Sequence, residues 1–369
     1  MNLTIAKEQL LHGLQAVQNV VSTRTTLPIL SNVLLRADDG RLQLTATDLD
    51  VTISCGVEAG VKKKGAITVP VKKLFGIVRE LPTPEIDMEV DEKNSCIVRS
   101  GASYYRINGL SAEEFPPVQP FKENKKITLP QEKVKGMLRR TSFATSTDES
   151  RYVLNGIFMT FKEHKMTLVA TDGRRLAMTD EEVDVAESSQ GEFILPTKAV
   201  NELNRLLQEK GDLDITFTEN QASFALKDEK GGSVLVISKL VEGNYPNFRQ
   251  VIPSETKERI PLGREEFLQA LRRAEIMTTD KSNSVKLSFT RNNLAITANS
   301  PEVGEARESL AINFKGKDVA IAFNPAYLIE PLAALNNDEV FMELIDELSP
   351  GVMKINGPFL YVVMPMRLT

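Results

Sequence analysis

The chain has 369 residues, a net charge of −5, 41% hydrophobic and 26% charged residues, as in an ordinary folded protein of two or three domains. The acidic balance excludes binding of nucleic acid by global charge, but not by a local basic surface. MNLTIAKEQLLHGL has no signal layout, and no run approaches the ~18 apolar residues of a membrane span. With two widely separated cysteines, these features predict a cytoplasmic protein with reduced thiols and no membrane partner.

Six stretches along the chain share one pattern, in which an apolar residue and a helix-start residue precede a helical period. The apolar residue is followed five and nine places later by residues on one helical face, and the first of these is apolar in all six stretches. The stretches begin at Ile5, Val69, Leu129, Leu195, Leu262 and Phe323. The pattern predicts six amphipathic helices of one repeated unit.

Short alternating runs with turn signals lie between these helices and predict antiparallel hairpins with one buried face. Adjacent units pair into a longer repeat, because Ala46-Thr47-Asp48 returns 124 residues later as Ala170-Thr171-Asp172. A weaker third copy is Ala298-Asn299-Ser300. The sequence therefore predicts an α+β protein of three similar domains, 1–125, 126–253 and 254–369, joined by the Pro-containing segments 115–126 and 244–259.

Few residues suggest catalysis. The two histidines, His12 and His164, have no Cys or His at metal-ligand spacing, and no glycine-rich phosphate loop opens a helix. We therefore expect no enzyme activity, cofactor or metal. An enzyme using Asp172 with Arg174 and Arg175 is the alternative, but the repeated Ala-Thr-Asp, which lacks arginines in its first copy, argues against it.

Charge is segregated, since the helix stretches are net positive while the rest of the chain is net negative. If all helices face one way, that face attracts phosphate. Helices packed ~10 Å apart would leave a hole of roughly 9 Å in a ring of six and roughly 28 Å in a ring of twelve. A DNA duplex about 20 Å across would pass only the larger hole. A DNA-encircling ring would therefore need two chains, and a scaffold that never encircles DNA is a further alternative.

Several motifs together resemble the bacterial sliding clamps, the beta subunits of DNA polymerase III. They are TLPILSNVLL, TATDLD, LVATDGRRLAM, SKLVEGNYPNFRQVIP and YVVMPMR, and they run from the first strand to the end of the chain. The resemblance implies the DNA clamp fold, in which helices line the inside of a head-to-tail homodimeric ring and sheets form the outside. It also implies a replication processivity factor that slides on double-stranded DNA without reading its sequence.

The resemblance implies DNA contacts at Arg24, in the loop before TLPIL, and at Lys73 and Lys198 on repeated helices. It further implies contacts at Arg151 and Tyr152 in the loop TDESRYVLNG. Val153 stands where the family often has a second aromatic residue.

The resemblance also implies an apolar cleft for short linear peptides of the polymerase III alpha subunit, the clamp loader delta subunit, other polymerases and repair proteins. The matching positions, called here the peptide surface, are Leu154, Thr171, Gly173, Arg174, Arg175, Leu176, Pro246, Val251, Asn324, Tyr327, Leu348, Val362, Met364 and Met366. Methionines suit a surface for varied partners, because the thioether chain adapts its shape. In this interpretation both arginines frame the rim, although Arg174 replaces a histidine common in the family.

For the dimer interface, the resemblance implies one apolar side at Tyr105 and Ile107 and the other at Ile276 and Met277. Glu302 and Glu305 are candidates for ion pairs with the partner subunit. Head-to-tail contacts of this kind close a ring only if their angles sum correctly.

Overall fold

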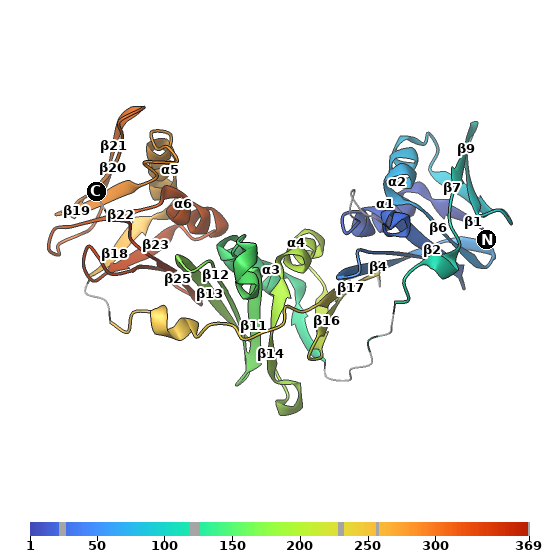
Figure 1. Ribbon diagram of the computed structural model, residues 1–369, viewed down its shortest axis with the longest axis horizontal. Helices are drawn as coiled ribbons and strands as arrows, with labels where there is room; N and C mark the ends of the chain where they lie inside the picture. Colours follow the sequence, from blue (N-terminus) through green and yellow to red (C-terminus); the bar gives the residue numbers. More distant parts are fainter. Residues whose placement is uncertain (22–26, 119–120, 122–125, 228–231, 256–257, 368–369) are drawn as a thin grey trace. The chain divides into compact units, whose positions relative to one another are not determined.

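The computed structural model describes residues 1–21, 27–118, 121, 126–227, 232–255 and 258–367. These residues form two compact units (Figure 1). The first unit joins residues 1–135 with 198–240, and the second joins residues 136–197 with 241–369. The division therefore cuts through the middle third of the chain.

The six predicted helices are all present in the described chain. They are α1 (Lys7–Val17), α2 (Val71–Glu80), α3 (Gln131–Thr141), α4 (Thr197–Leu206), α5 (Arg264–Glu275) and α6 (Pro325–Ala334). Each begins directly after the shared helix-start position, because the chain leaves an extended strand there. The apolar residues of the repeat are fully buried, as at Leu10, Leu74 and Phe267. The predicted helical period is thus confirmed.

The first compact unit contains two antiparallel sheets (Figure 1). The smaller has the order β5-β1-β7-β8-β9, with β1 (Asn2–Ala6), β5 (Gly60–Lys63), β7 (Glu85–Val90), β8 (Ser95–Ser100) and β9 (Ser103–Asn108). The larger has the order β10-β15-β16-β17-β4-β3-β2-β6. Its strands are β2 (Asn32–Asp38), β3 (Arg41–Thr47), β4 (Val51–Glu58), β6 (Gly65–Pro70), β10 (Ile127–Pro130), β15 (Asp212–Phe217), β16 (Gln221–Lys227) and β17 (Ser233–Lys239). Helices α1 and α2 pack against each other, and α1 packs on β3 and β4.

The second compact unit repeats this arrangement. Its larger sheet has the order β14-β11-β12-β13-β25-β24-β23-β18, and its smaller sheet has the order β21-β20-β19-β22. The larger sheet consists of β11 (Gly156–Lys162), β12 (Lys165–Thr171), β13 (Arg175–Glu182), β14 (Gly191–Pro196), β18 (Glu258–Gly263), β23 (Glu339–Leu344), β24 (Gly351–Lys354) and β25 (Phe359–Val363). The smaller consists of β19 (Val285–Thr290), β20 (Asn293–Ser300), β21 (Gly304–Ala311) and β22 (Val319–Phe323). Helices α5 and α6 pack against each other.

Each larger sheet crosses a predicted domain boundary through one strand pair. In the first unit β4 pairs with β17, and Val51 lies opposite Ser238. In the second unit β13 pairs with β25, and Arg175 lies opposite Val363. We call these pairs the first joint and the second joint. The joints explain why the compact units do not follow the predicted domains, since a hydrogen-bonded ladder holds strands together regardless of chain order.

Candidate functional site

The Ala-Thr-Asp repeat forms the same turn in both larger sheets. Asp172 Oδ1 accepts the backbone N–H groups of Arg174 and Arg175 at 2.9 and 3.1 Å. Asp48 Oδ1 accepts those of Asp50 and Val51 at 3.1 and 2.8 Å. In each copy, one aspartate oxygen fixes the backbone that leads into the next strand. Its repetition supports a structural role for the aspartate and weakens the enzyme alternative.

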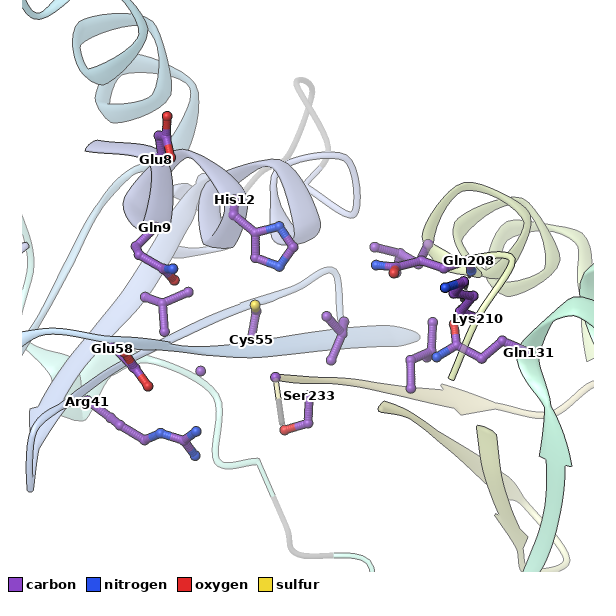
Figure 2. A pocket seen from close by; sticks show the side chains of 16 residues that line it. Glu8, Gln9, His12, Arg41, Cys55, Glu58, Gln131, Gln208, Lys210 and Ser233 are labelled. Carbon is purple, nitrogen blue, oxygen red and sulfur yellow. Dashed lines mark hydrogen bonds between the residues drawn. The ribbon is translucent and has the colours of Figure 1, made fainter. Parts of the chain in front are cut away.

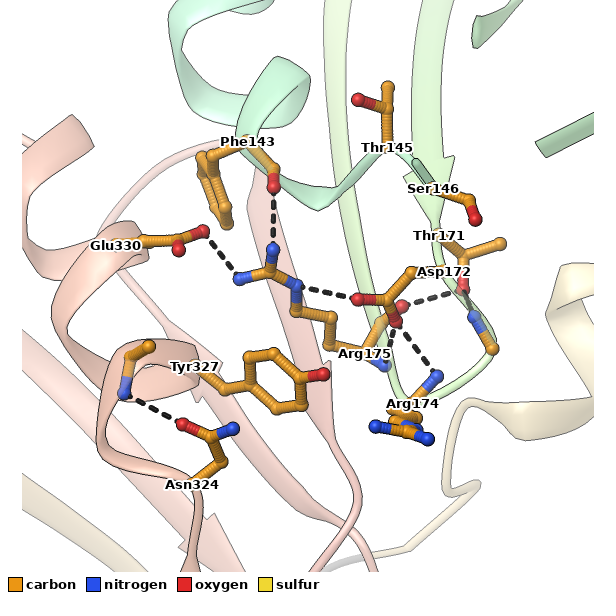
Figure 3. Close-up of polar contacts among 12 residues, drawn as sticks. Phe143, Thr145, Ser146, Thr171, Asp172, Arg174, Arg175, Asn324, Tyr327 and Glu330 are labelled. Carbon is orange, nitrogen blue, oxygen red and sulfur yellow. Dashed lines mark hydrogen bonds and ion pairs between the residues drawn. The ribbon is translucent and has the colours of Figure 1, made fainter. Parts of the chain in front are cut away.

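Arg175 is the centre of a buried charge network below this turn (Figure 3). Its Nε donates to Asp172 Oδ2 at 3.1 Å, and its Nη1 donates to Glu330 Oε2 at 2.5 Å. Its Nη2 donates to the carbonyl of Phe143 at 2.7 Å. Only 8% of the Arg175 side chain is exposed. One guanidinium therefore ties β13 to α6 and to the short 3-10 helix η3 (Ser142–Ala144).

These contacts correct one sequence expectation. Both arginines were expected on the rim, yet only Arg174 is exposed, while Arg175 is buried. Burial opposes the charge of Arg175, but the neighbouring Tyr361 and Glu330 outweigh it and raise the pKa of the guanidinium above its ordinary value. A buried guanidinium that donates to three acceptors supports the surface rather than framing it.

Helix α6 brings two peptide-surface residues to this network. Asn324 caps the helix by accepting the N–H of Ala326 at 3.0 Å. The guanidinium of Arg175 lies 4.5 Å from the centre of the Tyr327 ring. The hydroxyl of Tyr361 donates to the carbonyl of Tyr327 at 2.6 Å, so that residue is held from two sides. Burial raises the pKa of Tyr361, which keeps this hydroxyl a donor.

The remaining peptide-surface residues divide into buried and exposed sets. Leu176 and Val362 pack in one buried cluster with Phe248, and Leu154 is also buried. The exposed set consists of Pro246, Val251, Leu348, Met364 and Met366. Leu348 is 72% exposed and Val251 50%. Such a group of exposed apolar side chains is typical of a surface that binds a partner.

Strand pairing brings the C-terminal residues to the Gly-Arg-Arg turn. Met364 donates its backbone N–H to the carbonyl of Arg174 at 2.9 Å. Gly173 has a φ of 86°, a conformation that suits glycine, and its N–H donates to Thr171 Oγ1 at 3.1 Å. All peptide-surface residues lie in the second compact unit.

The predicted DNA contacts have different surroundings. Arg24 lies outside the described residues. Lys73 is exposed on α2. Tyr152 is 58% exposed, and Arg151 is ion-paired with Asp148 at 3.1 Å. Lys198 is ion-paired with Asp48, so part of its charge is already neutralised.

The predicted dimer contacts lie on β9 and just after α5. Tyr105 and Ile276 are 39% and 74% exposed, whereas Ile107 is buried in this single chain. Met277 is half-buried. Of the two acidic candidates, Glu302 faces Lys281 of its own chain at 3.5 Å, and Glu305 is exposed.

A cavity of about 590 Å³ with both polar and apolar lining residues lies in the first compact unit (Figure 2). Glu8 and His12 of α1 line it together with Arg41, Cys55 and Lys210. Its charged residues carry both signs, and none of the predicted site residues lines it. The cavity therefore does not favour one class of ligand.

The described part of the chain carries neither a metal-binding cluster nor a membrane-spanning helix. No group of three or more metal-ligating side chains is found there. None of the helices described is both long and apolar enough to cross a membrane. Cys55 and Cys96 are buried and not joined in a disulfide, and burial raises the pKa of the Cys96 thiol to about 12.

Comparison with known proteins assigns the family. Models of the N-terminal, central and C-terminal domains of the DNA polymerase III beta subunit match residues 1–119, 128–247 and 249–367. The chain belongs to the bacterial beta sliding clamp family. It is a DNA polymerase processivity factor with the clamp fold.

Individual relatives match over their whole length. A beta sliding clamp of Chlamydia muridarum is 35% identical over 100% of this chain and 99% of its own. A sliding clamp of Bartonella birtlesii, in a crystal structure bound to griselimycin, is 37% identical with a TM-score of 0.94. The beta subunit of Pseudomonas aeruginosa is 34% identical with a TM-score of 0.93. Both structures cover 100% of each chain.

Sequence reasoning missed the residues that support the site. Glu330 and Phe143 bind Arg175, but neither stands out in the sequence. The repeat contained a signal, because Glu330 and Glu202 each lie six places past a shared helix-start residue, Asn324 and Pro196. Glu202 is likewise bonded to an arginine, Arg205, at 2.6 Å.

Proposed function

We propose that two copies of this chain close head to tail into a ring that encircles duplex DNA, slides along it and tethers the replicative polymerase. The observation that carries the proposal is a repeated strand pairing. The first and second joints pair corresponding strands of successive domains, and the strands that would form a third such pair lie at the edges of the two smaller sheets. Strand β9 is the counterpart of β17 and β25, and β21 is the counterpart of β4 and β13. Within the described chain, β9 and β21 are edge strands. Edge strands present unpaired backbone groups that another chain can pair with.

The repeat also supplies a register for this proposed third joint. Val51 and Arg175, three places past Asp48 and Asp172, lie opposite Ser238 and Val363. Val303 holds the same place past Ser300. Strands β1, β10 and β18 hold the same position in the repeat, and the residues paired across the strands that follow each of them can be matched. In this alignment Ile107 corresponds to Ser238 and Val363. Val303 of one copy should therefore lie opposite Ile107 of the other, and Glu305 opposite Tyr105.

Cysteine cross-linking tests this register. Directly opposite Cα atoms lie about 4.5–5.5 Å apart, within reach of a disulfide. We expect the double variant Glu305→Cys with Tyr105→Cys to form covalent dimers and closed rings on oxidation. The matched control, Arg307→Cys with Tyr105→Cys, places the sulfurs diagonally and should cross-link poorly. Equal yields of cross-linked dimer from both cysteine pairs would contradict the proposed register between β9 and β21.

The ring itself is tested on DNA. A topologically linked ring should stay on nicked circular DNA after loading and leave rapidly once the circle is cut. Sequence-blind contacts to phosphate would come from Lys73, Arg151, Tyr152, Lys198 and Arg24. Equal retention on circular and linear DNA would support the scaffold alternative instead.

The peptide surface is proposed as the docking site for linear motifs of the polymerase III alpha subunit, the clamp loader delta subunit, other polymerases and repair proteins. Exposed Val251, Leu348 and Met364 supply apolar contact, and exposed Arg174 supplies a charge at the turn. Tethering through such a site raises the effective concentration of polymerase at the primer end. Arg174→Ala should weaken binding of an alpha-subunit peptide in calorimetry, and unchanged binding would remove Arg174 from the site.

The rest of the proposal follows the same family. Three clamp domains are assigned to residues 1–125, 126–253 and 254–369, and the dimer is assigned contacts at Tyr105, Ile107, Ile276 and Met277. The protein acts in the cytoplasm by binding alone, without cofactor or covalent chemistry. Fractionation of cells expressing a tagged chain tests the location.

A further inference from the structure

Glu330 is the charged link between the two halves of the peptide surface. One half is the turn from Thr171 to Leu176, and the other half includes Asn324 and Tyr327 at the start of α6. The Glu330 carboxylate on α6 accepts from Arg175 at 2.5 Å, and 40% of its side chain is exposed. Glu330 itself is not among the peptide-surface residues.

The Tyr327 ring lies against this link. The Arg175 guanidinium lies over the ring at 4.5 Å from its centre, which is cation–π geometry. Three acceptors hold the guanidinium there, namely the carboxylates of Asp172 and Glu330 and the carbonyl of Phe143 (Figure 3). Two of these acceptors are on the side of the turn and η3, and only Glu330 is on α6. Without Glu330, the guanidinium would follow Asp172 and no charge would hold it to α6.

We propose that Glu330 is a positioning residue of the peptide surface, which sets the place of Tyr327 relative to the Gly173 turn through the Arg175 guanidinium. This inference rests on the proposed peptide-binding function and assigns it a residue that would not touch the peptide. Pre-organisation of this kind raises affinity, because a bound peptide does not have to order the side chains it meets.

The chain contains a matched control for a merely structural effect. Glu202 holds the same repeat position on α4 and bonds Arg205 at 2.6 Å. Arg205 donates to the carbonyls of Gln15 and Ala16 at 2.8 and 2.7 Å, as Arg175 does to Phe143. Glu202 lies in the first compact unit, whereas the peptide surface lies in the second. Loss of Glu202 should therefore disturb a comparable arginine hydrogen-bond network without changing the peptide surface.

The experiment uses the full-length protein and a synthetic peptide of the C-terminal segment of the polymerase III alpha subunit from the same bacterium. Affinity is measured by calorimetry at a temperature at which circular dichroism shows every variant folded. We expect Glu330→Ala to weaken binding about tenfold, the typical range for one lost charged hydrogen bond. Glu330→Gln keeps an oxygen acceptor and should lose only about threefold, since a neutral hydrogen bond is weaker. Glu202→Ala should change affinity less than about twofold, because distant sites act independently.

A double variant separates positioning from general loosening. If Glu330 acts through the Tyr327 ring, Glu330→Ala should cause no further loss of affinity in a Tyr327→Ala background. Unchanged affinity in Glu330→Ala, an equal loss in Glu202→Ala, or fully additive losses with Tyr327→Ala would each overturn the inference. Absence of peptide binding by the unmodified protein would instead overturn the proposed function.

Discussion

The first and second joints share one backbone design but differ in where the arginine stands. In the second joint Arg175 begins strand β13 and is buried beneath the turn. In the first joint Val51 holds the same strand position. The arginine that links neighbouring elements is instead Arg205 on helix α4. Both arginines bond a glutamate of one helix and a backbone carbonyl near the end of another.

The difference shows how one repeat can serve two purposes. In the first joint, charge pairs lie at the turn, since Lys198 bonds Asp48, whose side chain is 13% exposed, and Lys239 bonds the exposed Asp50 at 3.1 Å. In the second joint, the charge network of Arg175 is buried, whereas Gly173 and Arg174 are exposed and the guanidinium of Arg151 lies beside Gly173. Because Arg175 is buried, its side chain does not occupy the exposed surface of the second joint.

The strongest test of this comparison is removal of the buried arginine. Arg175→Ala leaves Asp172 and Glu330 without their cation. We expect the free energy of unfolding to fall by about 3 kcal/mol, as for a broken buried ion pair. Urea titration followed by circular dichroism measures this. A loss below about 1 kcal/mol would show that the Arg175 network contributes little to the stability of the second joint.

Removal of the arginine of the first joint should have a smaller effect. The side chain of Arg205 is 30% exposed, so water can replace part of what it loses. Arg205→Ala also removes a cation from the carbonyls of Gln15 and Ala16 near the end of α1. We expect a loss of about 1–2 kcal/mol in the same titration. A loss equal to that of Arg175→Ala would mean that burial does not distinguish the two joints.

The turns themselves can be compared by exchanging their left-handed residue. Leu49 has a φ of 80° and Gly173 a φ of 86°, so one backbone shape holds a leucine in one joint and a glycine in the other. Gly173→Ala should cost about 1 kcal/mol in left-handed strain. Leu49→Gly should change stability by less, because relief of strain is offset by greater freedom of the unfolded chain. Thermal unfolding of both variants provides the measurement, and the opposite ranking would contradict the comparison.

The smallest effect is expected at the Lys198–Asp48 pair of the first joint, in which Lys198 is exposed and Asp48 is half-buried. Asp48→Asn removes the partner of Lys198, whose side chain is 43% exposed, so stability should change by no more than about 1 kcal/mol. The freed charge should instead steepen the salt dependence of DNA binding, by at most about one unit of slope. Binding to primed duplex across a salt series checks this. An unchanged slope would remove Lys198 from the DNA-binding set.

Much of this fold could be predicted from the repeat alone. Helix starts and buried helix faces are local properties, so six copies of one pattern were enough to place α1 to α6. The repeat of Ala-Thr-Asp was also visible in the sequence, and the structure adds that each aspartate side chain bonds its own neighbouring backbone in a turn. The same local signal could not show that β4 pairs with β17, since Val51 and Ser238 are far apart in sequence.

The site was harder to predict than the fold. Arg174 and Arg175 are adjacent and chemically identical, and what separates them is that Arg174 ends the exposed turn whereas Arg175 begins the buried strand β13. Glu330 could have been found by comparing the repeats position by position, since Glu202 holds the matching place. The partner carbonyl of Phe143 gives no signal in sequence.

The two joints bind successive domains by hydrogen bonds between strands, separately from the covalent segments that link the domains. Segments 115–126 and 244–259 link successive domains along the backbone, but the ladders β4–β17 and β13–β25 bind them across the sheet. A protease that cut both segments would sever the polypeptide, but it would leave the hydrogen bonds of both strand pairs intact. The three fragments are therefore expected to elute as a single particle. A single domain expressed alone would expose a strand edge and tend to aggregate.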